Sequence, residues 1–193
     1  SIRIGDPTRS RGIYTQEYSG HELFRVALDP RGDGNFFKVA SPPELEIIGN
    51  PATHFLVNLP ATPEIGRPVR LTVAAVDDVH NNPDFTYNGE LSITASDEDR
   101  TYQKTVTVNK ESGGVIGVDD LSFQTSRVSR VVVEDKLNRI RGVSNPVAPE
   151  FLTDYRIFFG DIHGHTRDCD GGGSLKDYLE WGRDVMNLDF CAV

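Results

Sequence analysis

A regular series of short β-branched runs constrains the fold of this chain more than any other feature of its sequence. Between residues 45 and 134 these runs recur at short intervals, separated by turn-forming stretches such as Asn81-Asn82-Pro83-Asp84 and Asn88-Gly89. The expected strands are residues 45–48, 54–59, 69–76, 89–95, 104–108, 121–123 and 128–134. This spacing is typical of an antiparallel β-sandwich, so the sequence predicts a mostly β fold.

Prolines divide the chain into three predicted segments. Pro42-Pro43 opens the strand-rich section and Pro146 and Pro149 close it, because proline interrupts regular pairing. Residues 1–40 are predicted to be a β-rich N-terminal segment, residues 41–149 the sandwich, and residues 150–193 a separate element. Within the sandwich, residues 70–76 and 105–108 alternate well enough to be half-buried antiparallel strands.

The charge balance limits the partners of the chain. Its 193 residues include 20 Lys and Arg against 29 Asp and Glu, which gives a formal net charge of −9. An acidic surface without a basic run argues against nucleic acid or an anionic membrane as the main partner. No apolar stretch approaches the roughly 20 residues that span a bilayer. The two cysteines, Cys169 and Cys191, fit no disulfide framework and are expected to be free thiols.

After residue 150 the pattern changes to strand, helix and strand. An apolar run at residues 155–165 is followed by three successive glycines and by residues 174–186, which have helical spacing and a possible cap at Ser174. Residues 188–193 provide the second strand. Parallel strands of this kind are usually covered on both faces, so the first strand is expected to be buried. An α/β barrel needs about eight such units. The remaining strands are therefore expected from further residues or from another chain.

Three potential metal ligands lie toward the end of the first of these strands. Because alternate side chains of a strand share a face, Asp161, His163 and His165 are expected to point the same way. Two neighbouring imidazoles suit a divalent ion such as Zn, Mn or Fe, and a carboxylate nearby adds a hard oxygen donor. The sequence therefore predicts a metal site at this strand end.

Part of the strand-rich section resembles bacterial immunoglobulin-like repeats. The resemblance rests on residues 66–77, 87–89, 131–135 and 144–147. It implies an immunoglobulin-like sandwich, a fold that often serves as a spacer or an adhesive module. Histidines inside such domains, here His54 and His80, are expected to have structural roles.

A second resemblance concerns the predicted metal site. Asp161-Ile162-His163-Gly164-His165-Thr166, followed by Asp170-Gly171, resembles the first signature of the PHP family, named for the polymerase and histidinol phosphatase. The family pattern has Ser where this chain has Cys169. The resemblance implies the first βαβ unit of a distorted α/β barrel that holds two or three divalent metal ions at its strand ends. It also implies hydrolysis of a phosphorylated small-molecule substrate by metal-activated water.

The PHP resemblance also implies roles for individual residues. His163 and His165 would bind the metal, and Asp170 would be a further ligand or a carboxylate close to it. Asp161 would fix an imidazole from outside the coordination sphere. Cys169 would touch the ligands without replacing them.

Two alternative functions remain open. Amidohydrolase-type metal hydrolases also start with a His-x-His pair on a first strand, but they attack amides or related bonds. The other alternative is a non-catalytic immunoglobulin-like module that binds a partner or spaces domains. Whichever enzyme class applies, the chain alone is expected to hydrolyse nothing and to retain metal weakly, because it lacks a closed set of ligands.

Overall fold

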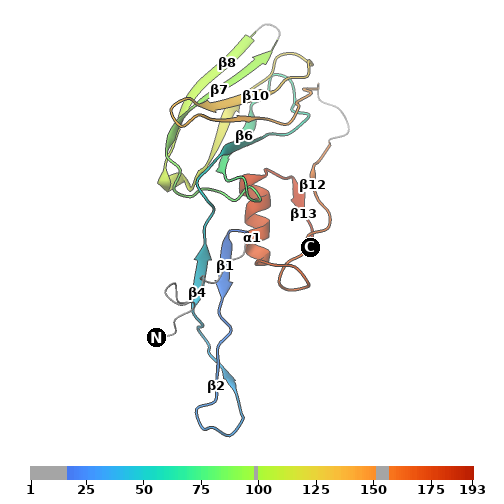
Figure 1. Cartoon of the computed structure of the whole chain (residues 1–193). Helices are drawn as coiled ribbons and strands as arrows, with labels where there is room; N and C mark the ends of the chain where they lie inside the picture. Colours follow the sequence, from blue (N-terminus) through green and yellow to red (C-terminus); the bar gives the residue numbers. More distant parts are fainter. Residues whose placement is uncertain (1–16, 98–99, 151–156) are drawn as a thin grey trace.

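Two antiparallel sheets form one end of the molecule in the computed structural model, which describes residues 17–97, 100–150 and 157–193 (Figure 1). One sheet consists of β7 (Gly89–Asp97), β8 (Arg100–Val108), β10 (Val131–Asp135) and β11 (Ile140–Val143), in the order β11-β10-β7-β8. The other consists of β5 (His54–Asn58), β6 (Val69–Val76) and β9 (Val115–Leu121), in the order β5-β6-β9. A mostly β fold with antiparallel sheets is therefore confirmed.

The sandwich core lies between the facing sides of these two sheets. Because successive side chains of a strand alternate, each strand contributes every second residue to the core. Fully buried side chains in it include Leu71, Val73, Leu91, Ile93, Val131 and Val133. Complete burial of one such aliphatic side chain contributes about 1.5–3 kcal/mol. This core is accordingly the main source of the stability of the sandwich.

Strand β6 is buried on both faces, so the prediction that residues 70–76 are half-buried is wrong. Leu71 and Val73 belong to the sandwich core, whereas Ala74 and Val76 pack with Val185 in a second, smaller cluster. The C-terminal helix supplies Val185 and covers this second face of β6. Residues 105–108 in the edge strand β8 do alternate between more and less exposed positions, as predicted.

A long two-stranded arm projects from the sandwich (Figure 1). It pairs β1 (Gly20–Leu23) with β4 (Glu44–Ile47) and, further out, β2 (Ala27–Leu28) with β3 (Phe37–Lys38). The assignment of residues 45–48 to the sandwich is thus wrong. Gly49 and Pro51 interrupt the chain between β4 and β5, and β4 instead pairs along its whole length with β1.

The outer part of the arm presents apolar side chains to solvent. Leu28 lies directly opposite Phe37, and the two residues are 56% and 59% exposed. At the tip, the Asp29 carboxylate accepts hydrogen bonds from the backbone amides of residues 31–34, and the Gly34 amide is the main cause that lowers the pKa of Asp29. These amides occupy both carboxylate oxygens, so the tip is a closed turn. A two-stranded ribbon without a covered face is only marginally stable in water.

The C-terminal helix agrees with its prediction. Helix α1 (Leu175–Glu180) begins after Ser174, whose hydroxyl accepts a hydrogen bond of 3.0 Å from the Asp177 amide. It continues as a π-helical segment, η2 (Trp181–Val185), and the chain then turns at Asn187, which has a left-handed φ of 52°. None of the helices in the described residues is long and apolar enough to cross a membrane.

Beside the helix, β12 (Gly160–Asp161) and β13 (Phe190–Cys191) pair in parallel. Phe158 and Ile162 are 63% and 78% exposed, and nothing in the described part of the chain covers them. Burial of the first strand by further residues or by another chain therefore stays a prediction. The first two residues of that predicted strand, 155 and 156, lie outside the described residues. A ladder of two residue pairs does not establish a barrel, so the barrel stays a prediction.

Candidate metal centre

The candidate metal ligands lie in the loop between β12 and α1. This loop is anchored at its start by the Gly164 amide, which donates to the Ala192 carbonyl at 2.9 Å, and in its middle by Thr166, which is 1% exposed. The Thr166 carbonyl accepts hydrogen bonds from the amides of Cys169 and Gly171, both at 3.0 Å. These bonds close a tight turn over residues 166–171, so the loop has a defined shape.

His163 and His165 converge at the surface, although neither lies in a strand. Their Nε2 atoms are 2.8 Å apart and their ring centroids 4.7 Å apart. Both histidines are exposed. The expected strand ends at Asp161, so the alternation of a strand does not bring the two rings together. The folded loop does.

Asp170 and Cys169 approach the other nitrogen of His165. Nδ1 of this ring is in close contact with Asp170 Oδ1, and Cys169 Sγ lies 3.9 Å from the same nitrogen. Ligand atoms of His165, Cys169 and Asp170 all lie within 4.8 Å of one another. A side chain at Gly171 would collide with the turn, because its Cβ would lie 2.5 Å from the His165 carbonyl carbon. Glycine at residue 171 therefore allows the backbone of the turn to pack closely against His165.

Asp161 acts on the backbone of the loop. Its Oδ1 accepts a hydrogen bond of 3.0 Å from the His163 amide, and its Oδ2 accepts one of 2.9 Å from the Tyr178 hydroxyl. The His163 amide, followed by the Tyr178 hydroxyl, lowers the pKa of the Asp161 carboxyl. Partial burial, followed by the contact with Asp161, raises the pKa of Tyr178 to about 12. The structure thus places Asp161 where it holds the His163 main chain, whereas the resemblance implies a contact with an imidazole.

The distances and the donor atoms fit a divalent metal ion. Two ligand atoms bound about 2.1 Å from one ion lie about 3.0–3.4 Å apart, and the two Nε2 atoms, at 2.8 Å, need little movement to reach this separation. Imidazole, carboxylate and thiol groups are all ligands of Zn and related ions. The sequence prediction does not count Cys169 among the candidate ligands, although its sulfur lies close to His165. Its position directly before Asp170 is the available signal, because adjacent residues of a tight turn reach the same ring.

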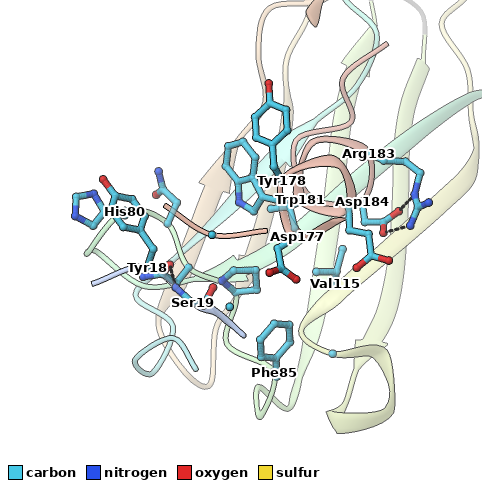
Figure 2. A pocket seen from close by; sticks show the side chains of 18 of the residues that line it. Tyr18, Ser19, His80, Phe85, Val115, Asp177, Tyr178, Trp181, Arg183 and Asp184 are labelled. Atoms are coloured by element: carbon cyan, nitrogen blue, oxygen red, sulfur yellow. Dashed lines mark hydrogen bonds and ion pairs between the residues drawn. The ribbon is translucent and has the colours of Figure 1, made fainter. Parts of the chain in front are cut away.

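A groove of about 1390 Å³ lies between the helix, the base of the arm and the rim of the sandwich, and His165 is among the residues that line it. In Figure 2, Asp177 and Trp181 from the helix face this groove together with Tyr18 from the base of the arm. Asp177 is engaged by the Ser174 hydroxyl at 2.6 Å, and it approaches His21 Nδ1 at 3.6 Å. Among the candidate ligands, His165 is the one that borders this groove, which is large enough for a small molecule.

The two histidines of the strand-rich section, which the sequence predicts to be structural, both have hydrogen-bonding partners. His54 Nε2 lies 2.8 Å from Asn81 Oδ1, and His80 Nε2 lies 2.9 Å from Glu17 Oε2. Each ring thus has a hydrogen-bonding partner outside the metal-site loop. Cys169 and Cys191 are free thiols, as predicted.

Comparison with known proteins does not assign the chain to a family. No protein-family model matches it, and no curated protein matches it significantly. Among solved structures it is similar to the PKD domain of an M14-like peptidase from Thermoplasmatales archaeon SCGC AB-540-F20, with 15% sequence identity over 53% of this chain and 99% of that chain. The TM-score is 0.28, so this similarity assigns neither a fold family nor a function.

Proposed function

We propose that this chain carries the first metal-binding segment of a metal-dependent phosphoesterase. The observation that supports it best is the convergence of His163, His165 and Asp170 on one exposed loop, whose His165 borders a groove. The bound ions would supply an activated water and would neutralise charge on the phosphoryl oxygens. The sequence pattern of this loop is the reason for preferring phosphate esters to amides, which amidohydrolase-type enzymes attack.

Each residue of the loop has a role in this proposal. His163, His165 and Asp170 hold the metal through nitrogen and oxygen atoms. Asp161 fixes the main chain at His163 through the amide, and Tyr178 holds Asp161 in turn. The Tyr178 phenol is protonated across the neutral range and can serve as a donor, and partial burial and its contact with Asp161 raise its pKa further, to about 12.

The proposal includes further strands that complete a barrel beside β12 and β13. Phe158, Phe159 and Ile162 are all at least half exposed, although large apolar residues in parallel sheets are usually covered. Further residues or another chain would cover them. Among the residues that the structure describes, the candidate ligands are exposed and lie on one loop, so we expect weak metal binding and no turnover from the chain by itself.

A titration of this chain with Zn²⁺ and with Mn²⁺ by calorimetry tests the metal centre. Weak binding is expected in the wild type, it should disappear in His165→Ala, and it should persist in the control His54→Ala, whose ring bonds Asn81 instead. Binding that survives His165→Ala would refute the site. Absence of binding in the wild type would favour the non-catalytic module, in which the sandwich serves as a spacer or binding domain.

Assays of the whole natural protein with phosphate-ester and amide substrates would separate the two enzyme classes. Metal-dependent release of phosphate is the expected result. Cleavage of amides without phosphate release would show that the amidohydrolase alternative is correct.

A further inference from the structure

We infer that Cys169 is a direct ligand of a metal ion held on the Nδ1 side of His165, together with Asp170. This inference rests on the proposed metal centre and revises its donor set for one ion: His165, Cys169 and Asp170 are the ligands, and His163 orients the His165 ring instead of binding that ion. It assigns to Cys169 a role that neither the sequence pattern nor the comparisons indicate. The consequence is a site with nitrogen, sulfur and oxygen ligands.

The distances around Nδ1 already approach those of a bound ion. Zinc binds imidazole nitrogen at about 2.0–2.1 Å and thiolate sulfur at about 2.3 Å, so in a tetrahedral site these two atoms lie about 3.6 Å apart. Cys169 Sγ is 3.9 Å from His165 Nδ1, and an oxygen of Asp170 lies within 4.8 Å of both. Small side-chain rotations are sufficient to direct all three atoms to one ion.

The turn holds the sulfur in place before any metal binds. The Thr166 amide donates to Cys169 Sγ at 3.3 Å, and the thiol donates to the Thr166 carbonyl at 3.1 Å. On metal binding the thiol releases its proton to solvent, and the resulting thiolate keeps the bond from the amide. Only the bond from the thiol to the carbonyl is lost, and that carbonyl keeps its two backbone donors.

The contact between the two histidines is compatible with this arrangement. If Nδ1 of His165 binds the ion, its Nε2 carries the proton and can donate to His163 Nε2 across the observed 2.8 Å. His163 then orients the ring from the far side, as carboxylates and carbonyls do at many metal-bound histidines. The hydrogen bond between His163 and His165 can therefore remain when the ion binds.

A thiolate ligand changes which metal the site prefers. Thiolate ligands favour Zn and other softer ions, whereas Mn and Mg prefer carboxylate and water oxygens. The chain should thus bind Zn²⁺ more tightly than Mn²⁺, and the difference should depend on Cys169.

Cobalt provides a direct test, because a thiolate bound to Co²⁺ gives a charge-transfer band in the near ultraviolet that nitrogen and oxygen ligands do not give. The full chain is titrated with Co²⁺ under a phosphine reductant, with absorbance and calorimetry recorded together. We expect the band in the wild type and in Cys191→Ser, and its loss in Cys169→Ser. We also expect Cys169→Ser to weaken Zn²⁺ binding by at least about tenfold and Mn²⁺ binding by much less. Circular dichroism of the variants confirms that they fold.

The possible outcomes separate this inference from the proposed function. Co²⁺ binding that needs His165 but gives no band would overturn the role of Cys169 and leave the metal centre intact. A band that persists in Cys169→Ser would place the thiolate elsewhere and would overturn the inference in the same way. Lack of any metal binding would overturn both.

Discussion

The buried hydrogen bond between Tyr87 and Asp135 allows a quantitative test of how the sandwich is stabilised. The Tyr87 hydroxyl donates to Asp135 Oδ2 at 2.7 Å, and the two residues are 6% and 2% exposed. Tyr87→Phe removes this bond and little else. The ring stays in the core, where it makes an edge-to-face contact with Phe55 at a centroid distance of 5.7 Å.

The expected loss of folding stability in Tyr87→Phe depends on the hydrogen bonds that Asp135 keeps. A hydrogen bond to a charged group contributes about 1.5–3 kcal/mol to stability. In the variant the carboxylate still accepts from the amides of Leu137 and Asn138 and from the Asn138 side chain, at 2.8–2.9 Å. Because no buried charge is left without partners, the lower value applies, and Tyr87→Phe should cost about 1.5 kcal/mol.

The chain offers a matched control for this substitution. Tyr102 makes the same type of bond, from its hydroxyl to Asp120 Oδ1 at 2.8 Å, but this pair lies at the exposed surface. Water replaces a lost partner there, so Tyr102→Phe should cost about 0.5 kcal/mol or less. Urea unfolding followed by circular dichroism measures both values. Equal costs for the two variants would refute the argument from burial.

The cost of Tyr87→Phe should also depend on pH. Burial raises the pKa of Asp135, but hydrogen bonds from Asn138 and Tyr87 lower it by more, so the net pKa lies below the ordinary value. A carboxylate with a lowered pKa stabilises the fold fully above the unfolded-state pKa of about 4 and loses this contribution as the pH falls through the folded-state pKa. The difference between wild type and variant should therefore narrow below about pH 4. A difference that grows in acid would contradict this assignment.

Two further predictions concern the helix and the arm. Val185→Asp places a carboxylate in the small cluster with Ala74 and Val76, so the helix should leave β6 and the emission of Trp181, the single tryptophan, should move to longer wavelength. An unchanged emission maximum would show that this cluster does not hold the helix. In hydrogen exchange, amides of β2 and β3 should exchange at least about 10³-fold faster than those of β7, because every residue of these two short strands is exposed. Equal protection would mean that the apolar side of the arm is covered.

The strands that the sequence predicts are those with strong β preference of their own. Residues 54–59 and 69–76 correspond closely to β5 and β6, since both are apolar or β-branched runs. Strand β11 is absent from the prediction, because Arg141 and Gly142 weaken its pattern. It forms because Asp135 accepts the amides of residues 137 and 138 and closes a tight turn that returns the chain along β10.

Strand β9 shows how tertiary contacts override a weak local pattern. Gly117 and the pair Asp119-Asp120 are poor strand formers, so only the end of this strand is predicted. In the fold, Arg70 lies 3.0 Å from Asp119 and Lys104 lies 2.8 Å from Asp120. These cations belong to β6 and β8. Because exposed ion pairs of this kind contribute little, β9 is held mainly by its ladder with β6 and by the burial of Val118 and Leu121.

The candidate metal centre shows a different limit of reasoning from sequence. Alternation along a strand predicts that His163 and His165 share a face, but both lie in the loop after β12 and converge because that loop is folded. Residue spacing cannot specify how the His165 ring is turned. Its Nε2 faces His163 and its Nδ1 faces Cys169 and Asp170. One side offers a second imidazole, and the other offers a thiol and a carboxylate. In the proposed metal centre, the metal preference depends on which nitrogen of His165 binds, and this is set by the turn at residues 166–171 and not by the histidine spacing.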